Sequence, residues 1–201
     1  MRFLEDRNVR GRILKTSGLL VWSALLALAF ATPPSVLAQA KPGLTLTTTA
    51  FEDGGIIPTK YTAAASGPPV SPKLIWTNVP DKVVSFALIE RDPDTSVDNT
   101  TIEILHWIIF NIPASSRELP EKVPAVGQLP DGAVQGLNYT KKVGYIGMGA
   151  PAPGPFHHYT FELFALDMKL SLSSTATETD VLRAMDGHIL AKGVVVGRFH
   201  R

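Results

Sequence analysis

A small set of aspartate, histidine and tyrosine side chains stands at the ends of apolar runs, where binding sites on β scaffolds usually lie. Asp92 and Asp94 close one apolar run, His106 opens another, and His157 and Tyr159 begin a third. Because side chains alternate along a strand, His157 and Tyr159 are expected to point to the same face. The spacing therefore predicts polar groups that gather at one edge of a sheet.

These residue types suit the binding of an anionic oxygen. Two imidazole N–H groups and a phenol O–H are directional hydrogen-bond donors. A carboxylate such as that of Asp92 can accept a hydrogen bond from the far nitrogen of a histidine and fix its tautomer. The prolines of the loop over residues 149–155 make a stiff wall that need not reorganise on binding. Because no lysine or arginine belongs to the set, we expect modest affinity.

Each of these residues also has an ordinary structural interpretation. His106 could be a histidine that is satisfied at a strand end, and Tyr159 a core residue with a bonded hydroxyl. Asp92 and Asp94 could cap the turn at the proline between them, and Asp92 could do so while supporting a histidine. Pro151 is expected to stiffen its loop more than to touch a ligand.

The same groups could also serve catalysis, because two histidines and a carboxylate can ligate iron or zinc or assist hydrolysis. No activated nucleophile is evident in the sequence, which also has no metalloprotease helix motif, phosphate loop or serine elbow. We therefore expect a binding protein that is not an enzyme and that uses neither a metal nor another cofactor.

Short strands are expected to position these residues. Runs of branched and aromatic residues predict strands at residues 45–49, 74–76, 83–89, 102–112, 159–166 and 193–199. The continuous apolarity of residues 102–112 predicts burial on both faces, as in a sheet packed between two layers. Residues 113–136 and 144–155 are rich in proline and glycine and are expected to be irregular.

One short helix is expected late in the chain. Thr177 and Asp180 have the spacing of a capping box, and Val181, Leu182 and Met185 are expected to form one apolar helical face. The glycine at position 187 can end this helix. The whole pattern predicts a mainly β domain with two antiparallel sheets in a sandwich-like arrangement and a short C-terminal helix.

Composition limits the classes of function. The chain has 201 residues, 45% of them hydrophobic, which suffices for one domain with a sizeable core. Residues 1–40 hold five basic and two acidic side chains, and the rest holds 14 basic and 16 acidic ones, a net charge of −2. A weakly acidic body with no basic cluster argues against nucleic acid as a partner. The absence of cysteine excludes disulfides and thiol chemistry.

Residues 1–40 have the plan of a secretory signal peptide. An apolar run over residues 19–31 follows a basic stretch, and small residues offer cleavage after Ala38 or Ala40. The apolar run is shorter than the roughly 20 residues that span a bilayer. We therefore expect cleavage, no stable membrane span afterwards, and a periplasmic or secreted protein.

Five ordered segments resemble the phosphatidylethanolamine-binding protein family, in its bacterial, Raf-kinase-inhibitor-like branch. They are residues 71–76 (SPKLIW), 86–89 (FALI), 92–94 (DPD), 106–113 (HWIIFNIP) and 157–159 (HHY). Each segment alone is weakly specific, whereas five in this order with compatible spacing cover most of the chain after residue 40. The family-like domain is therefore expected to span residues 43–201.

The resemblance implies two antiparallel sheets with a small anion-binding pocket at one end. The ligand-binding residues that it implies are Asp92, Asp94, His106, Pro151, His157 and Tyr159. Two residues depart from the family pattern: Arg91 replaces a small or acidic residue, and Ala150 stands where Gly-Pro usually begins the loop. We therefore expect a loop of different shape, which changes the size of ligand that fits.

The function that follows is an exported module that binds a small anion, such as phosphate or a phospholipid headgroup. Because eukaryotic relatives bind and inhibit kinases, the alternative is a protein-interaction or kinase-inhibitor-like regulator that acts outside the cytoplasm. Its protein partner is not identified by the sequence.

Overall fold

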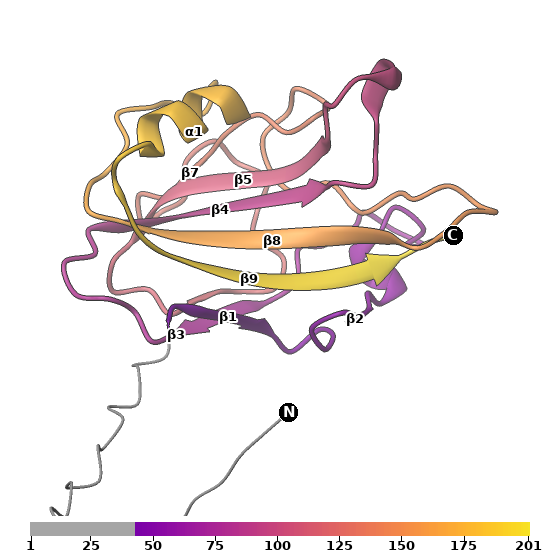
Figure 1. Ribbon diagram of the computed structural model, residues 1–201, viewed down its shortest axis with the longest axis horizontal. Helices are drawn as coiled ribbons and strands as arrows, with labels where there is room; N and C mark the ends of the chain where they lie inside the picture. The colour runs from indigo at the N-terminus through magenta and orange to yellow at the C-terminus, as the bar shows by residue number, and fades with distance from the viewer. Residues whose placement is uncertain (1–42) are drawn as a thin grey trace, which may run out of the picture. The chain divides into compact units, whose positions relative to one another are not determined.

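The computed structural model describes residues 43–201, which form two β-sheets and one α-helix (Figure 1). The smaller sheet has three strands, in the order β1 (Thr45–Thr48), β3 (Leu74–Thr77) and β6 (Glu118–Leu119). The larger sheet has six, in the order β2 (Gly55–Ile56), β9 (Ile189–Phe199), β8 (His157–Leu166), β4 (Ser85–Asp92), β5 (Ile104–Pro113) and β7 (Val134–Gln135). Two 3₁₀ turns occupy Thr59–Tyr61 and Val97–Asn99. The expected signal peptide lies outside the described residues.

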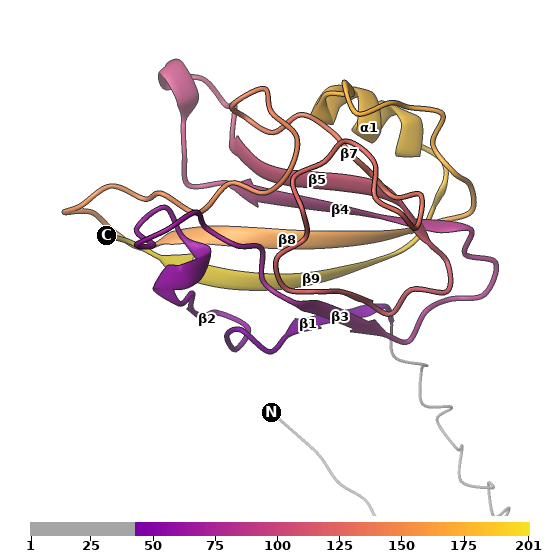
Figure 2. The same ribbon diagram turned by 180° about the vertical axis from the view of Figure 1, so that it is seen from behind.

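The mainly β class with two sheets and one helix is confirmed, with one refinement of strand direction. All the pairings in both sheets are antiparallel except that of β2 with β9, a parallel contact of two residues at the sheet edge. Seen from either side, β1 and β3 cover one face of the larger sheet, and the helix α1 (Glu178–Met185) covers the other (Figure 2). The larger sheet is therefore a middle layer.

This middle position explains the unbroken apolar run of β5. Trp107 and Ile109 join the core between the two sheets, whereas Ile108 and Phe110 join the core beneath α1. Both faces of this strand are buried, so apolar residues follow one another without a polar alternation. The predicted double burial of residues 102–112 is confirmed for residues 105–110, whereas Ile102 lies before the strand and is 58% exposed.

The helix begins as its capping box predicts. Thr177 Oγ1 accepts a hydrogen bond from the backbone N–H of Asp180, and the Asp180 carboxylate accepts one from the backbone N–H of Thr177. Val181 and Met185 are buried, but Leu182, which was expected on the same face, is 40% exposed. The eight-residue helix ends before Gly187, whose φ is +79°. Within residues 43–201, no helix has the length and apolar character needed to cross a membrane.

The stretch over residues 113–136 is less irregular than expected, because it contains the short strands β6 and β7. Part of the irregular backbone in this stretch is held by hydrogen bonds to the buried side chain of Gln135. Its Nε2 donates to the carbonyls of Pro124 and Val126, at 2.7 and 2.8 Å, and its Oε1 accepts from Nε1 of Trp107 at 2.7 Å. One amide side chain thus satisfies backbone groups that no strand pairs.

Candidate functional site

The predicted polar residues gather at one end of the larger sheet because of its strand order. β4 lies between β5 and β8 and runs antiparallel to both, so the end of β4 meets the beginnings of its two neighbours. Asp92, the last residue of β4, is the register partner of Ile104, and Arg91 is that of Thr160. Residues that are far apart in the sequence thereby reach one site.

A cavity of about 230 Å³ lies at this end of the sheet. Its wall includes four of the six predicted residues, which are Asp92, His106, Pro151 and His157. The rest of the wall comes from Thr95, Ile104, Tyr139, Ile146, Gly147, Gly149 and Ala150. The rim expected over residues 149–155 therefore contributes only its first part to the wall, through residues 149–151.

Asp92 is nearly fully buried and positions His157. Its Oδ2 accepts a hydrogen bond from Nδ1 of His157 at 2.8 Å, and its Oδ1 accepts one from the backbone N–H of Asp94 at 3.0 Å. Both interpretations of Asp92, as a turn cap and as the support of a histidine, are therefore found together. Because Nδ1 of His157 is committed, Nε2 is the ring nitrogen left to meet a ligand.

His106 reaches the cavity through an irregularity in β5. Glu90 pairs with Trp107 and the next residue, Arg91, pairs with Leu105, so His106 is an extra residue opposite β4. Such a β-bulge turns a side chain away from the regular alternation. The ring of His106 packs edge-on against that of Tyr159, with 5.3 Å between centroids and 81° between the planes.

The ring and backbone of His106 are both bonded to Ile146. Nδ1 of His106 lies 3.0 Å from the carbonyl oxygen of Ile146, and the backbone N–H of Ile146 donates to the carbonyl of His106 at 3.1 Å. Burial lowers the pKa of His106, although the Ile146 carbonyl and the charge of Asp92 oppose this. The ring is therefore held neutral at a lower pH than an exposed histidine.

Tyr159 lies behind the cavity wall. It is fully buried, and its hydroxyl oxygen accepts a hydrogen bond from the backbone N–H of Ala150 at 3.1 Å. Burial, followed by the charge of Asp92, raises the pKa of its phenol. Tyr159 thus has the core-packing role that the sequence also allowed. Its hydroxyl also holds the loop over residues 149–155 through the bond to Ala150.

Asp94 lies apart from the cavity wall. Its carboxylate accepts from the backbone N–H of His158 at 2.6 Å and lies 2.8 Å from Nδ1 of the same residue. Both side chains are largely exposed, and although partial burial acts to raise it, these bonds with His158 lower the pKa of Asp94 below its ordinary value. His158 is exposed, and as the next residue along β8 it lies on the face opposite to His157.

Several wall residues were missed by sequence reasoning. Thr95 donates from its hydroxyl to the carbonyl of Asp92 at 2.8 Å and accepts from the backbone N–H of Ile104 at 3.0 Å, so it links the end of β4 to the start of β5. Its position just after the DPD motif was the available signal. Tyr139 and Ile146 are brought in by backbone bonds to β5, and Ile146 also by the ring of His106, which no local pattern reveals.

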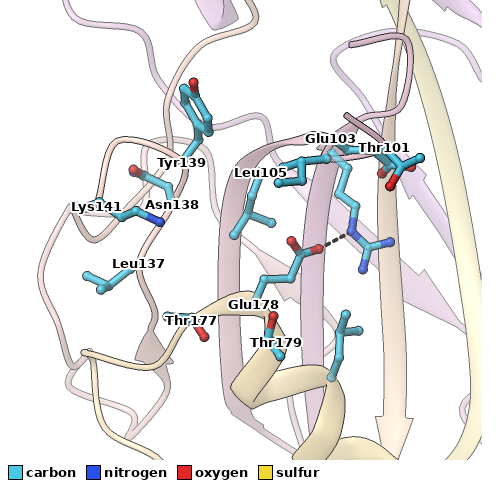
Figure 3. A pocket seen from close by; sticks show the side chains of 13 residues that line it. Thr101, Glu103, Leu105, Leu137, Asn138, Tyr139, Lys141, Thr177, Glu178 and Thr179 are labelled. Atoms are coloured by element: carbon cyan, nitrogen blue, oxygen red, sulfur yellow. Dashed lines mark hydrogen bonds and ion pairs between the residues drawn. The ribbon is translucent and has the colours of Figure 1, made fainter. Parts of the chain in front are cut away.

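A larger cavity, of about 500 Å³, holds none of the predicted residues (Figure 3). Glu178 at the start of α1, Glu103 and Tyr139 are among the side chains that line it. Its Arg91 is already paired, with Glu178 through Nε and with Glu162 at 2.9 Å. The smaller cavity, whose wall holds four of the six predicted residues, is therefore the better candidate for the site.

Among residues 43–201, no group of three or more histidine, aspartate or glutamate side chains is placed to hold a metal ion. In the smaller cavity, the nearest such arrangement is the pair of histidines with Asp92. There, Nδ1 of His106 and Nδ1 of His157 are both committed to oxygen partners. The arrangement is suited to hydrogen bonding with a small polar ligand.

Comparison with known proteins agrees with this architecture. Residues 47–200 match the family described as phosphatidylethanolamine-binding protein. A UPF0098 protein of Methanothermobacter thermautotrophicus is 44% identical over 79% of this chain and 99% of its own length, and one of Aquifex aeolicus is 38% identical over 75% and 85%.

Two solved structures show the same fold. Escherichia coli YbcL, described as a member of the mammalian phosphatidylethanolamine-binding protein family, superposes with a TM-score of 0.71 at 28% identity, covering 80% of this chain and 99% of YbcL. A putative homologue from Chlamydia trachomatis gives a TM-score of 0.68 at 36% identity, covering 79% and 98% of the two chains. This chain belongs to the phosphatidylethanolamine-binding protein family.

Proposed function

We propose that this chain is an exported binding protein for a small anion, such as phosphate or a phosphorylated headgroup. The observation that carries the proposal is the pairing of His157 with the buried carboxylate of Asp92 at the cavity wall. In the imidazolium form of His157, Nδ1 donates to this carboxylate and Nε2 carries a proton that an anionic oxygen can accept. A cavity of about 230 Å³ suits a group of a few heavy atoms.

The affinity should be modest. The wall contains no lysine or arginine, and Asp92 brings a negative charge close to the ligand. The anion is therefore held by directional hydrogen bonds and not by a cluster of cations. Such a site releases its ligand readily, which suits a carrier or a sensor of a small molecule.

Binding without catalysis is part of the proposal. Of the two hydroxyl-bearing residues in the wall, Thr95 gives its proton to the carbonyl of Asp92, so it is not paired with a base. The second, Tyr139, is 45% exposed. We likewise propose that the protein works without a cofactor and without nucleic acid, in line with its weakly acidic body.

Export is supported by the signal-peptide pattern of residues 1–40. The exported chain is then expected to begin at Gln39 or Lys41 and to act in the periplasm or outside the cell. Sequencing the N-terminus of protein recovered from outside the cytoplasm tests this, and a chain that still begins at Met1 would contradict cleavage.

The binding proposal is tested by calorimetric titration with phosphate and with phosphoethanolamine. We expect saturable binding, which His157→Ala weakens by about 1–3 kcal/mol through the loss of a charge-assisted hydrogen bond. His158→Ala is the matched control, because the neighbouring ring lies on the opposite face and bonds Asp94. Equal losses in the two folded variants would show that His157 does not contact the anion.

A further inference from the structure

The hydrogen bonds of His106 determine which ring nitrogen carries the proton. A carbonyl oxygen can only accept, so Nδ1 must donate to the carbonyl of Ile146, 3.0 Å away. The backbone bond between the same two residues, at 3.1 Å, holds this geometry from the other side. In the neutral ring, Nε2 is therefore a hydrogen-bond acceptor with a free lone pair.

This acceptor is buried and has no partner among residues 43–201. His106 is 4% exposed, and its ring belongs to the cavity wall. The ionisable groups around it are Asp92 on β4, His157 and Tyr159 on β8, and Tyr139 on the loop that pairs with the start of β5. The hydroxyl of Tyr159 accepts from Ala150, and Asp92 is engaged with His157.

A buried polar atom without a partner destabilises the protein until something satisfies it. An anion whose oxygens are all deprotonated can only accept hydrogen bonds, so it cannot satisfy Nε2 of His106. An anion that keeps one proton can donate to this nitrogen while its other oxygens accept from His157.

Charge leads to the same distinction. The wall contains no lysine or arginine, so the carboxylate of Asp92 faces at most one cationic group there, the ring of His157 in its protonated form. A dianion would place two further negative charges against this pair, whereas a monoanion places one.

From these contacts we propose that the site takes its anion in a protonated form and that Nε2 of His106 accepts the hydrogen bond of that proton. The ligand class is then the monoanion of a phosphate monoester. This inference rests on the proposed anion-binding function and names the form of ligand that the site selects.

Methyl phosphate and methyl sulfate make a matched pair of probes. At pH 6 about half of the methyl phosphate is a monoanion with one acidic proton, because such esters lose their second proton near pH 6. Methyl sulfate has nearly the same size and the same single charge but no proton to donate. Methyl sulfate does not titrate between pH 6 and pH 8, so any change in its affinity comes from ionisable groups of the protein. The ratio of the methyl phosphate affinity to the methyl sulfate affinity therefore isolates the effect of the ligand's proton.

Calorimetric titration of the wild type should show methyl phosphate binding about tenfold to a hundredfold more tightly than methyl sulfate at pH 6. The ratio should fall as the pH rises to 8 and the dianion forms. Nitrogen-15 spectra of the free protein should show His106 as the neutral tautomer with its proton on Nδ1. Equal affinities at pH 6, or a protonated Nε2 in the neutral ring, would overturn the inference.

His106→Asn is the informative variant, because its amide N–H can still donate to Ile146 while the acceptor at Nε2 is removed. The ratio should fall to within about twofold in this variant, and a ratio that is unchanged would overturn the inference. If His106→Asn does not fold, the wild-type ratio and spectra decide alone. Wild type that binds both probes equally refutes only the role of the proton, whereas wild type that binds neither refutes the anion site as well.

Discussion

Nδ1 of His157, in the first residue of β8, lies 2.8 Å from Oδ2 of Asp92, in the last residue of β4. The two side chains are 12% and 3% exposed, so water competes little for this bond. The other oxygen of Asp92 accepts from the backbone N–H of Asp94. One carboxylate thus joins two strand ends and the turn between β4 and β5.

Removing this carboxylate should therefore cost stability. We expect Asp92→Ala to lower the free energy of unfolding by about 1–3 kcal/mol, because it leaves a buried imidazole and a backbone N–H without their acceptor. Asp94→Ala is the control, since Asp94 pairs with a largely exposed His158 and should cost less than about 1 kcal/mol. Urea unfolding of the two variants at pH 7 gives the comparison, and equal losses would contradict the role of Asp92.

Glu90 provides a test of pH dependence. It is fully buried in the middle of β4, both its carboxylate oxygens lack a partner among the described residues, and burial, then the charge of Asp92, raises its pKa well above 4.5. A pKa raised by folding makes a carboxyl group favour the folded state at low pH. This contribution is complete below pH 4.5 and is lost as the pH rises toward the folded pKa.

The glutamine side chain of Glu90→Gln cannot ionise, so the unfolding free energy of this variant should not fall with pH for this reason. The difference in unfolding free energy between Glu90→Gln and the wild type should shift in favour of the variant by up to about 1.4 kcal/mol per pH unit above 4.5. The slope is the readout, because a buried amide adds a cost that does not change with pH. Parallel stability curves from pH 4 to pH 8 would show that Glu90 ionises freely in the folded protein.

Two glycines of the cavity wall differ sharply in the space around them. A Cβ on Gly147 would lie 2.6 Å from the backbone carbon of Thr62 and 2.7 Å from the nitrogen of Ala63, whereas one on Gly149 would meet only the Cβ of Ala63 at 3.7 Å. Gly147→Ala should therefore destabilise the protein by about 1–3 kcal/mol and displace the neighbouring carbonyl of Ile146. Gly149→Ala should leave the melting temperature almost unchanged, and similar melting temperatures for both variants would contradict the close approach.

Arg91 joins the larger sheet to the helix. It bonds Glu162 on β8 and Glu178 on α1, and its side chain is 19% exposed. Arg91→Met keeps the apolar stem but leaves two carboxylates without this cation, so we expect a loss of about 1–2 kcal/mol in unfolding free energy. Lys73→Met breaks the more exposed pair with Glu118 and should have a smaller effect.

A mutation on the helix side of the larger sheet should leave ligand affinity in the cavity unchanged. Arg91 lies on the helix side, whereas its neighbour Asp92 faces the cavity, so Arg91→Met should leave phosphate binding within about twofold of the wild type. A large loss of affinity in the folded variant would show that the two faces are coupled.

The six longer strands and the helix start could be predicted because their signals are local, whereas the two-residue strands β2, β6 and β7 were missed. The apolar run of β5 is enough by itself to predict a buried strand, and the capping box at Thr177 is enough to predict the start of a helix. Leu182 was misplaced because it is flanked by one buried and one exposed helical position, and spacing alone does not say where the apolar face ends.

Most residues of the candidate site could be predicted from the sequence, but their hydrogen-bond partners could not. That Asp92 and His157 would belong to one site followed from their places at the ends of apolar runs and from the family resemblance. The separation of Asp94 from the cavity depends on its bond to His158, a neighbour from another strand. The acceptor role of His106 depends on a backbone carbonyl 40 residues away, and every residue has such a carbonyl.

The extra residue of β5 has an evolutionary consequence. Without His106, Leu105 and Trp107 would still face their own cores and pair with Arg91 and Glu90, since both pairings already exist on either side of it. His106 is therefore an insertion of one residue into a strand whose pairing is complete without it. A lineage could gain or lose this cavity histidine by a single codon, while the folding of the domain continued under its own selection.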